Sequence, residues 1–237
     1  MTPEKLVEEL KKACPTGLKS VVLYGSAAAG DHAGKRSDYN VLVVTEDLGT
    51  ATLDALSKPA AKWAQAGNPA PLLFTQERLA QATDVFPIEL LDIRECHQIL
   101  HGENLVAELE IDTKNLRLQL EHELRGKLIR LRQAYLLTGG KPKAVADLMV
   151  QSLSTFLVLF RAALRLFGDR VPQPKFQALE ELAGHLDFDV AVFRQVQELK
   201  DGTQKPKDVA VGELFNTYLK TIECVIDAVD AFIHQGE

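Results

Sequence analysis

Hydrophobic and polar residues follow two kinds of pattern along the chain, and the pattern changes near residue 110. Before that point, short apolar runs bounded by turn residues predict strands, whereas apolar residues at three- to four-residue spacing predict helices. The expected strands are 20–25, 39–47, 70–75 and 87–96, and the expected helices are 2–14, 50–67 (interrupted at Pro59) and 76–83. The first 110 residues are therefore expected to fold around a small mixed sheet.

After about residue 110 the strand pattern ends and only helical spacing remains. Leucine and other apolar residues recur with the helical period in five segments: 115–140, 143–169, 174–186, 190–202 and 211–235. Helices joined by short loops favour an up-and-down bundle. The pattern predicts an α+β fold with a sheet-containing domain at 1–110 and a helical bundle domain at 111–237.

Composition narrows the class of protein. Hydrophobic residues make up 46% and charged residues 25% of the 237 residues, which is ordinary for a globular protein. The net charge of -6 argues against a general nucleic-acid binder, which needs a basic face. The three cysteines are far apart and form no CxxC pair, so neither a zinc site nor a disulfide framework is indicated.

Nothing in the apolar pattern indicates a membrane protein. The longest apolar stretch, LSTFLVLFRAALRLF, is broken by Arg161 and Arg165 and is too short to span a bilayer. The amphipathic N-terminus lacks the apolar core of a signal peptide. We expect a cytoplasmic protein.

The candidate chemistry lies in the stretch 25–44, GSAAAGDHAGKRSDYNVLVV. Gly25 and Ser26 follow an apolar strand, where backbone N–H groups and a hydroxyl can receive phosphate oxygens. Asp38 and Asn40 stand one residue apart at the start of the next strand, so both side chains lie on one face. An Asp-x-Asp pair at such a place can hold two Mg²⁺ ions against a triphosphate.

This stretch resembles the signature of the polymerase-beta-like nucleotidyltransferase superfamily, which is a Gly-Ser, a short helix and a Ser-Asp-x-Asp leading into an apolar strand. The helical second half is similar in architecture to the aminoglycoside adenylyltransferases. The resemblance implies a nucleotidyltransferase-like domain, Mg²⁺, ATP or another nucleoside triphosphate, and a hydroxyl acceptor on a small molecule or protein. The matching positions, in the expected order, are Gly25, Ser26, Gly30, Ser37, Asp38 and the strand 41–44.

The resemblance also implies roles for single residues. Gly25, Ser26 and Ser37 would contact the nucleotide, while Asp38, Asn40 and a third carboxylate would bind the metal and serve catalysis. The segment FPIELLDIREC offers Glu89 and Asp92, which a strand would point to opposite faces, so only one can join Asp38. We favour Glu89, because PIEL is similar to the Pro-x-Glu strand of the aminoglycoside adenylyltransferases, where this Glu is the base for the acceptor hydroxyl.

Two positions depart from the family pattern. Asn40 stands in place of the second Asp, and an amide oxygen can bind a metal ion but brings no charge. Ala29 stands where the family often has Arg. The alternative hypothesis is therefore a catalytically degenerate module that binds a nucleotide or a protein partner, such as a regulatory component of a toxin–antitoxin pair.

Other motifs give weaker or negative signals. A P-loop is excluded, because Ala29 replaces its first Gly and Arg36 its Ser or Thr. His97 and His101 are four residues apart, and surface histidines are favoured over a metal pair. Two arginines seven residues apart, Arg125 and Arg132, share one face of the first long helix. They belong either to a solvated face or to a basic surface that contacts the triphosphate or an anionic substrate.

Overall fold

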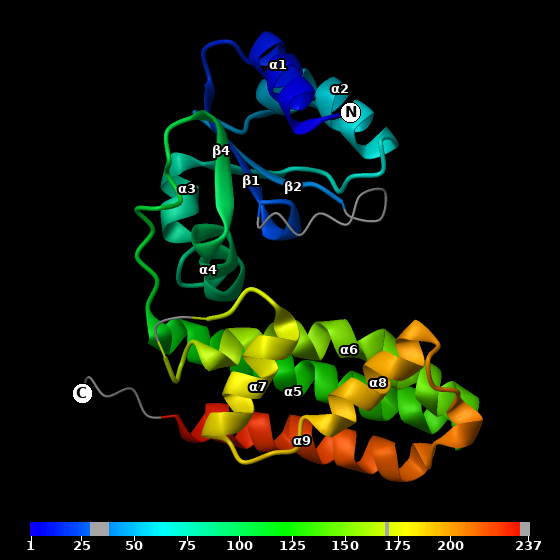
Figure 1. Cartoon of the computed structure of the whole chain (residues 1–237). Coiled ribbons are helices and arrows are strands. Elements are labelled where there is room, and N and C mark those ends of the chain that lie inside the picture. The colour runs from blue at the N-terminus through cyan, green and yellow to red at the C-terminus, as the bar shows by residue number, and fades with distance from the viewer. Residues whose placement is uncertain (29–37, 169–170, 233–237) are drawn as a thin grey trace. The chain divides into compact units, whose positions relative to one another are not determined.

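A computed structural model describes residues 1–28, 38–168 and 171–232 of the chain (Figure 1). The chain divides into two compact units, Met1–Asp112 and Thr113–Glu237. The first unit contains a four-stranded sheet and the second is helical. The predicted α+β fold class, a small mixed sheet followed by a helical bundle, is confirmed.

The sheet has the strand order β3-β2-β1-β4. Its central strand β1 is antiparallel to β2 and to β4, whereas β2 and β3 are parallel, so the sheet is mixed as expected. The bounds are Leu18–Tyr24 for β1, Asn40–Thr45 for β2, Leu72–Thr75 for β3 and His97–Gly102 for β4.

Each face of the sheet carries its own apolar core, because alternate residues of β1 and β2 point to opposite sides. One core joins Val21, Leu23, Val41 and Val43 to helices α1 (Pro3–Ala13) and α2 (Thr50–Gln65), and it encloses Trp63. The other core joins Val22, Leu42 and Val44 to helices α3 (Gln76–Gln81) and α4 (Pro87–Glu95). Both faces of β1 and β2 are therefore covered, which explains their continuous Val and Leu runs.

The prediction of a fourth strand at 87–96 is wrong, since these residues form α4 and Glu89 lies on a helix. Pro87 occupies the first helical position, where its missing N–H costs nothing. The fourth strand is β4, immediately afterwards, which the sequence pattern missed. The expected interruption at Pro59 is also wrong, because α2 is continuous through it.

Over residues 113–168 and 171–232, the second unit contains five α-helices where five were predicted, and a short 3-10 turn at Pro206–Asp208. The central helix α6 packs against the other four, which are α5, α7, α8 and α9. The bounds are Thr113–Thr138 for α5, Pro142–Leu164 for α6, Lys175–His185 for α7, Ala191–Asp201 for α8 and Val211–Ala231 for α9.

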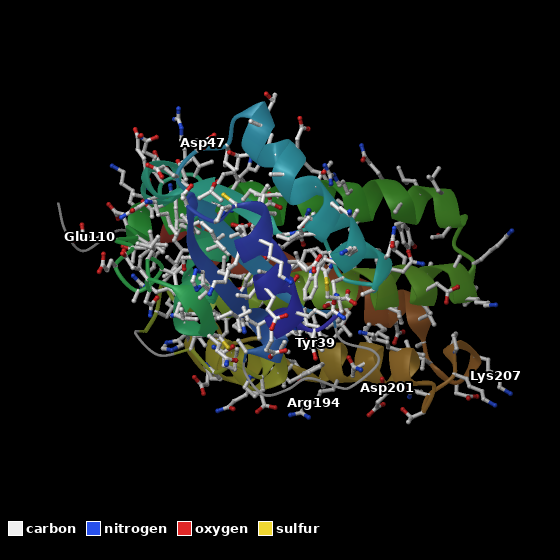
Figure 2. The ribbon with its side chains drawn as sticks, turned by 90° about the horizontal axis from the view of Figure 1, so that it is seen from above. Tyr39, Asp47, Glu110, Arg194, Asp201 and Lys207 are labelled. Carbon is white, nitrogen blue, oxygen red and sulfur yellow. The ribbon has the colours of Figure 1, made fainter. Side chains whose placement is uncertain are left out.

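By length and composition alone, α6 could cross a membrane, so the expectation of too short a stretch does not hold for the whole helix. In the bundle its aromatic residues are buried. Phe156 meets Tyr218 of α9 edge to face at 5.9 Å, and Phe160 meets Phe193 of α8 at 5.4 Å. On α8 the charged Arg194, labelled in Figure 2, lies on the exposed side of the helix. The apolar character of α6 is accounted for by its place in the core.

Candidate functional site

The end of β1 and the start of β2 bring two predicted site residues together. Gly25 follows β1 with a φ of 78°, a left-handed conformation that favours glycine, and begins the one-turn 3-10 helix η1 (Gly25–Ala27). Asn40 pairs with Tyr24 in the antiparallel ladder. A Cβ atom added to Gly25 would stand 3.4 Å from Nδ2 of Asn40. The amide of Asn40 therefore lies directly beside the Gly25 turn.

The residues that lead into β2 alternate between the two faces of the sheet. Tyr39, labelled in Figure 2, packs on the α1–α2 side with its ring 6.1 Å from that of Trp63. Its N–H donates a hydrogen bond of 3.1 Å to Oδ1 of Asn68. Asn40 is half-buried, and its strand parity with Leu42 places it on the α3–α4 side. Asp38 is exposed and lies two residues before the first residue of β2.

The junction of α4 and β4 is bonded to the same turn. The N–H of Gly25 donates to the carbonyl oxygen of Cys96 at 3.4 Å, and the thiol of Cys96 donates to the carbonyl oxygen of Gly25 at 3.6 Å. Nδ1 of His97 lies 3.1 Å and 3.0 Å from the carbonyl oxygens of Ile93 and Arg94, at the C-terminal end of α4. These contacts hold the end of α4 against the Gly25 turn.

Glu89 and Asp92 occupy positions that the strand hypothesis did not anticipate. Both lie on α4, three residues apart, and a helix places such a pair on the same side rather than on opposite sides. Glu89 is exposed in the first turn and Asp92 is half-buried. Glu89 precedes Cys96, the residue that contacts the Gly25 turn, by seven residues, which corresponds to about 10 Å of rise along a helix. The strand-parity argument that only one of Glu89 and Asp92 can face Asp38 is therefore wrong, because both lie on a helix.

The donor set suits one Mg²⁺ ion better than two. Asp38 supplies a carboxylate and Asn40 an amide oxygen, and Mg²⁺ commonly needs only one or two protein ligands beside the phosphates of a nucleotide. Neither β3 nor β4 contains an Asp or Glu to complete a second ion. Within residues 1–28, 38–168 and 171–232, no three His, Cys, Asp or Glu side chains are grouped for a metal ion.

Part of the predicted nucleotide-binding signature lies outside the described residues, whereas Tyr24, which the sequence analysis did not single out, lies beside the candidate site. Ser37 lies outside the described residues, as do Ala29 and Gly30, while Ser26 belongs by its backbone to η1. Tyr24, the last residue of β1, lies between Asn40 and His97 in the sheet. Burial raises the pKa of the Tyr24 hydroxyl. The position of Tyr24 directly before the Gly25–Ser26 pair is the sequence feature that could have identified it.

The two arginines predicted to contact the nucleotide lie within the helical unit and have carboxylate partners there. Arg125 contacts Glu121 at 2.9 Å and Asp230 at 3.2 Å, and Arg132 contacts Glu223. The hydrogen bond from Arg125 lowers the pKa of Glu121. Both arginines line a cavity of about 400 Å³ on the helical unit, together with Leu128, Ile129, Glu223, Ile226 and Asp227. Their nucleotide contact stays a prediction.

Comparison with known proteins gives a match at the level of the fold. No protein-family model and no curated protein sequence matches the chain. The chain is similar to the crystal structure of spectinomycin adenyltransferase AAD(9) from Enterococcus faecialis with ATP and spectinomycin, at 13% identity and a TM-score of 0.53, covering 92% of this chain and 100% of that one. A toxin–antitoxin structure with AMP-PNP gives 18% identity over 59% of this chain and 100% of that chain, but its TM-score of 0.31 supports no argument. The chain has a nucleotidyltransferase-like fold.

Proposed function

We propose that the chain is a nucleotidyltransferase that binds ATP or another nucleoside triphosphate where β1, η1 and the start of β2 meet. It transfers the nucleoside monophosphate to a hydroxyl of a small molecule or protein. The observation that carries this proposal is the left-handed Gly25 turn beside Asn40, with Asp38 two residues earlier. It occurs in a fold shared with an adenyltransferase over 92% of the chain.

The roles of the residues follow from their chemistry. Backbone N–H groups of a tight glycine turn bind phosphate oxygens, and Ser26 and Ser37 are assigned to the same phosphates. The carboxylate of Asp38 and the amide oxygen of Asn40 would hold one Mg²⁺ ion. That ion, when bound, neutralises phosphate charge. Cys96 is a positioning residue, because it bonds to Gly25.

Glu89 is assigned the role of general base for the acceptor hydroxyl, with Asp92 as the alternative on the same side of α4. A Glu89→Gln variant keeps the size of the side chain and removes its basicity. It is expected to lower the rate of transfer while leaving nucleotide affinity unchanged. If Asp92→Asn has that effect instead, the base is Asp92.

Nucleotide binding and turnover in an Asp38→Ala variant test the proposal. Wild-type protein should bind ATP with Mg²⁺ in calorimetry and release pyrophosphate when supplied with an acceptor. Asp38→Ala should lose both signals, because it removes the one charged ligand of the site. Asp54→Ala, which removes another exposed carboxylate, on α2, is the matched control and should behave as wild type. Turnover that survives in Asp38→Ala would refute the assignment.

A second function is favoured by two observations: the neutral Asn40, and the lack of any carboxylate on β3 and β4. The chain would then bind a nucleotide or a protein partner through the same turn without catalysis. An Asn40→Asp variant distinguishes the two functions, because it restores the second carboxylate. Activity that appears only in this variant supports the degenerate module, whereas robust activity of the wild type excludes it. We propose a cytoplasmic location, where the nucleoside triphosphate of the transfer reaction is available.

A further inference from the structure

A cavity of about 240 Å³ lies between helices α5 and α6 of the helical unit, and it is named the α5–α6 cavity. An apolar cavity of about 150 Å³ is large enough to bind benzene, so this one has room for a slightly larger organic molecule. Helix α5 lines it with residues three and four positions apart, which share one face of the helix: Lys127, Arg130, Leu131 and Ala134. The two ends of the cavity differ in their chemistry.

One end of the α5–α6 cavity is apolar. Helices α5 and α6 are joined by a short connection and run antiparallel, so Ala134 and Leu148 lie at the end nearest that connection. Leu131 and Phe156 line the cavity with buried side chains, since only 4% and 1% of their surfaces are exposed. The ring of Phe156 is held edge to face against that of Tyr218 at 5.9 Å. A compact apolar group therefore fits this end of the cavity.

The hydroxyl of Ser152, which also lines the cavity, already has its hydrogen-bond partners within the bundle. It donates to the carbonyl oxygen of Met149 at 3.0 Å, and its oxygen lies 3.0 Å from the hydroxyl oxygen of Tyr218. Since a serine has one hydroxyl proton, Tyr218 is the donor in the second bond. Both hydroxyl protons are thus used inside the protein, and a ligand has to be bound by other polar groups.

The other end of the α5–α6 cavity is cationic. Lys127 and Arg130 line it farther from the connection, and no Asp or Glu is among the described residues that line the cavity. Lys127 contacts Glu123 at 3.3 Å along the same helix. The exposed Arg130 forms no ion pair or hydrogen bond with any residue in the ranges 1–28, 38–168 and 171–232. An exposed arginine without a partner is ordinary, but this one borders a cavity in which no carboxylate balances its charge.

The cavity between α5 and α9 differs from the α5–α6 cavity in this respect. Its arginines, Arg125 and Arg132, are paired with carboxylates of the chain, and Glu223 and Asp227 are among its lining residues. The protein itself therefore balances the positive charge there. In the α5–α6 cavity, a bound anion would take that place.

Helix α6 adds neutral hydrogen-bond donors to the cationic end. Gln151 and Arg130 lie about equally far along their helices from the connection, and Thr155 lies one turn farther. Neither Gln151 nor Thr155 forms a side-chain hydrogen bond with another described residue. An amide NH₂ group, a hydroxyl and a guanidinium can all donate, and the planar guanidinium matches the two oxygens of a carboxylate. This end of the cavity therefore favours a carboxylate.

We propose that the α5–α6 cavity binds a small carboxylate with a compact apolar body, such as an aromatic ring or a branched chain. The carboxylate contacts Arg130 and Lys127, and the apolar body packs on Leu131 and Phe156. Because the cavity lies within the helical unit, this site does not depend on the proposed transfer reaction.

Calorimetry of the full chain with phenylacetate and with 4-methylpentanoate tests the class of ligand. At least one of these acids should bind, and 2-phenylethylamine, which carries a positive charge on a similar body, should bind about tenfold more weakly or less. Arg130→Gln should weaken binding by about tenfold or more, because it removes the guanidinium that contacts the carboxylate. Lys143→Gln, which removes an exposed cation of α6 outside the cavity, is the matched control and should bind as wild type. No binding of either acid, equal binding of the amine, or unchanged affinity in Arg130→Gln overturns the proposal.

Filling the cavity tests the location of the site without changing its charge. Ala134→Leu places a larger side chain at the apolar end and should abolish binding of the acid, while Arg130 stays in place. Gln133→Leu, at an exposed neighbouring position outside the cavity, is the control and should keep wild-type affinity. Thermal unfolding confirms that both variants are folded. Wild-type affinity in a folded Ala134→Leu variant would refute the proposed location.

Discussion

At the scale of single residues, the proposed phosphate site depends on a backbone angle at Gly25. Its φ of 78° turns the chain immediately after β1, and the amide of Asn40 occupies the space beside it. The Gly-Ser pair and the Asp38–Asn40 pair were both found from the sequence, because each is local. The bonds from Cys96 to Gly25 were not, because they join residues 71 positions apart.

Gly25→Ala is expected to weaken nucleotide binding and to destabilise the first unit by about 1–2 kcal/mol, because the left-handed conformation is strained for alanine. Calorimetry with ATP and thermal unfolding measure the two effects. Gly126→Ala is the control, since a Cβ at Gly126 meets no atom within 4 Å and that glycine lies inside α5. It should raise stability slightly and leave nucleotide affinity unchanged. Normal affinity in Gly25→Ala would contradict the phosphate-binding role of the turn.

At the scale of elements, charge pairing along α5 predicts a pH dependence. Arg125 lowers the pKa of Glu121, so this pair stabilises the folded state above the unfolded pKa of glutamate, about 4.3. Protonation of Glu121 at lower pH removes that contribution. The stability difference between wild type and Arg125→Met should therefore be present at pH 7 and shrink as the pH falls below about 4. Denaturant unfolding at several pH values measures it, and a difference that grows on acidification would contradict the assignment.

The elements also show how far sequence patterns extend. Strands β1, β2 and β3 and the long helices α5 to α9 were predicted, because a buried run or a sustained helical period is a local signal. Helix α4 was missed, because PIELLDIREC is short and its apolar residues fit either period, and the resemblance to a Pro-x-Glu strand favoured the wrong one. Because of that error, Glu89 was predicted to lie on a strand, whereas it lies on helix α4. The choice between helix and strand for this segment depends on tertiary contacts, in which Leu90 and Ile93 pack on the sheet.

At the scale of the whole molecule, the chain divides into two compact units, and the unfolding of each unit can be measured with its own spectroscopic signal. Trp63, the only tryptophan, is fully buried in the first unit, while most helical residues belong to the second. Phe160→Ala on α6 should cost about 3–5 kcal/mol in the bundle, because it leaves a cavity in that core. Circular dichroism at 222 nm should then unfold at a lower temperature, while tryptophan fluorescence keeps its transition. Equal shifts of both signals would show that the units unfold as one.

We propose that a nucleoside triphosphate binds where β1, η1 and the start of β2 meet. A crystal structure of the full chain with a non-hydrolysable ATP analogue and Mg²⁺ tests it most directly. We expect phosphate oxygens at the backbone of the Gly25 turn, with a Mg²⁺ ion at the carboxylate of Asp38 and the amide oxygen of Asn40. A nucleotide bound elsewhere, or no bound nucleotide at saturating concentration, would contradict the account.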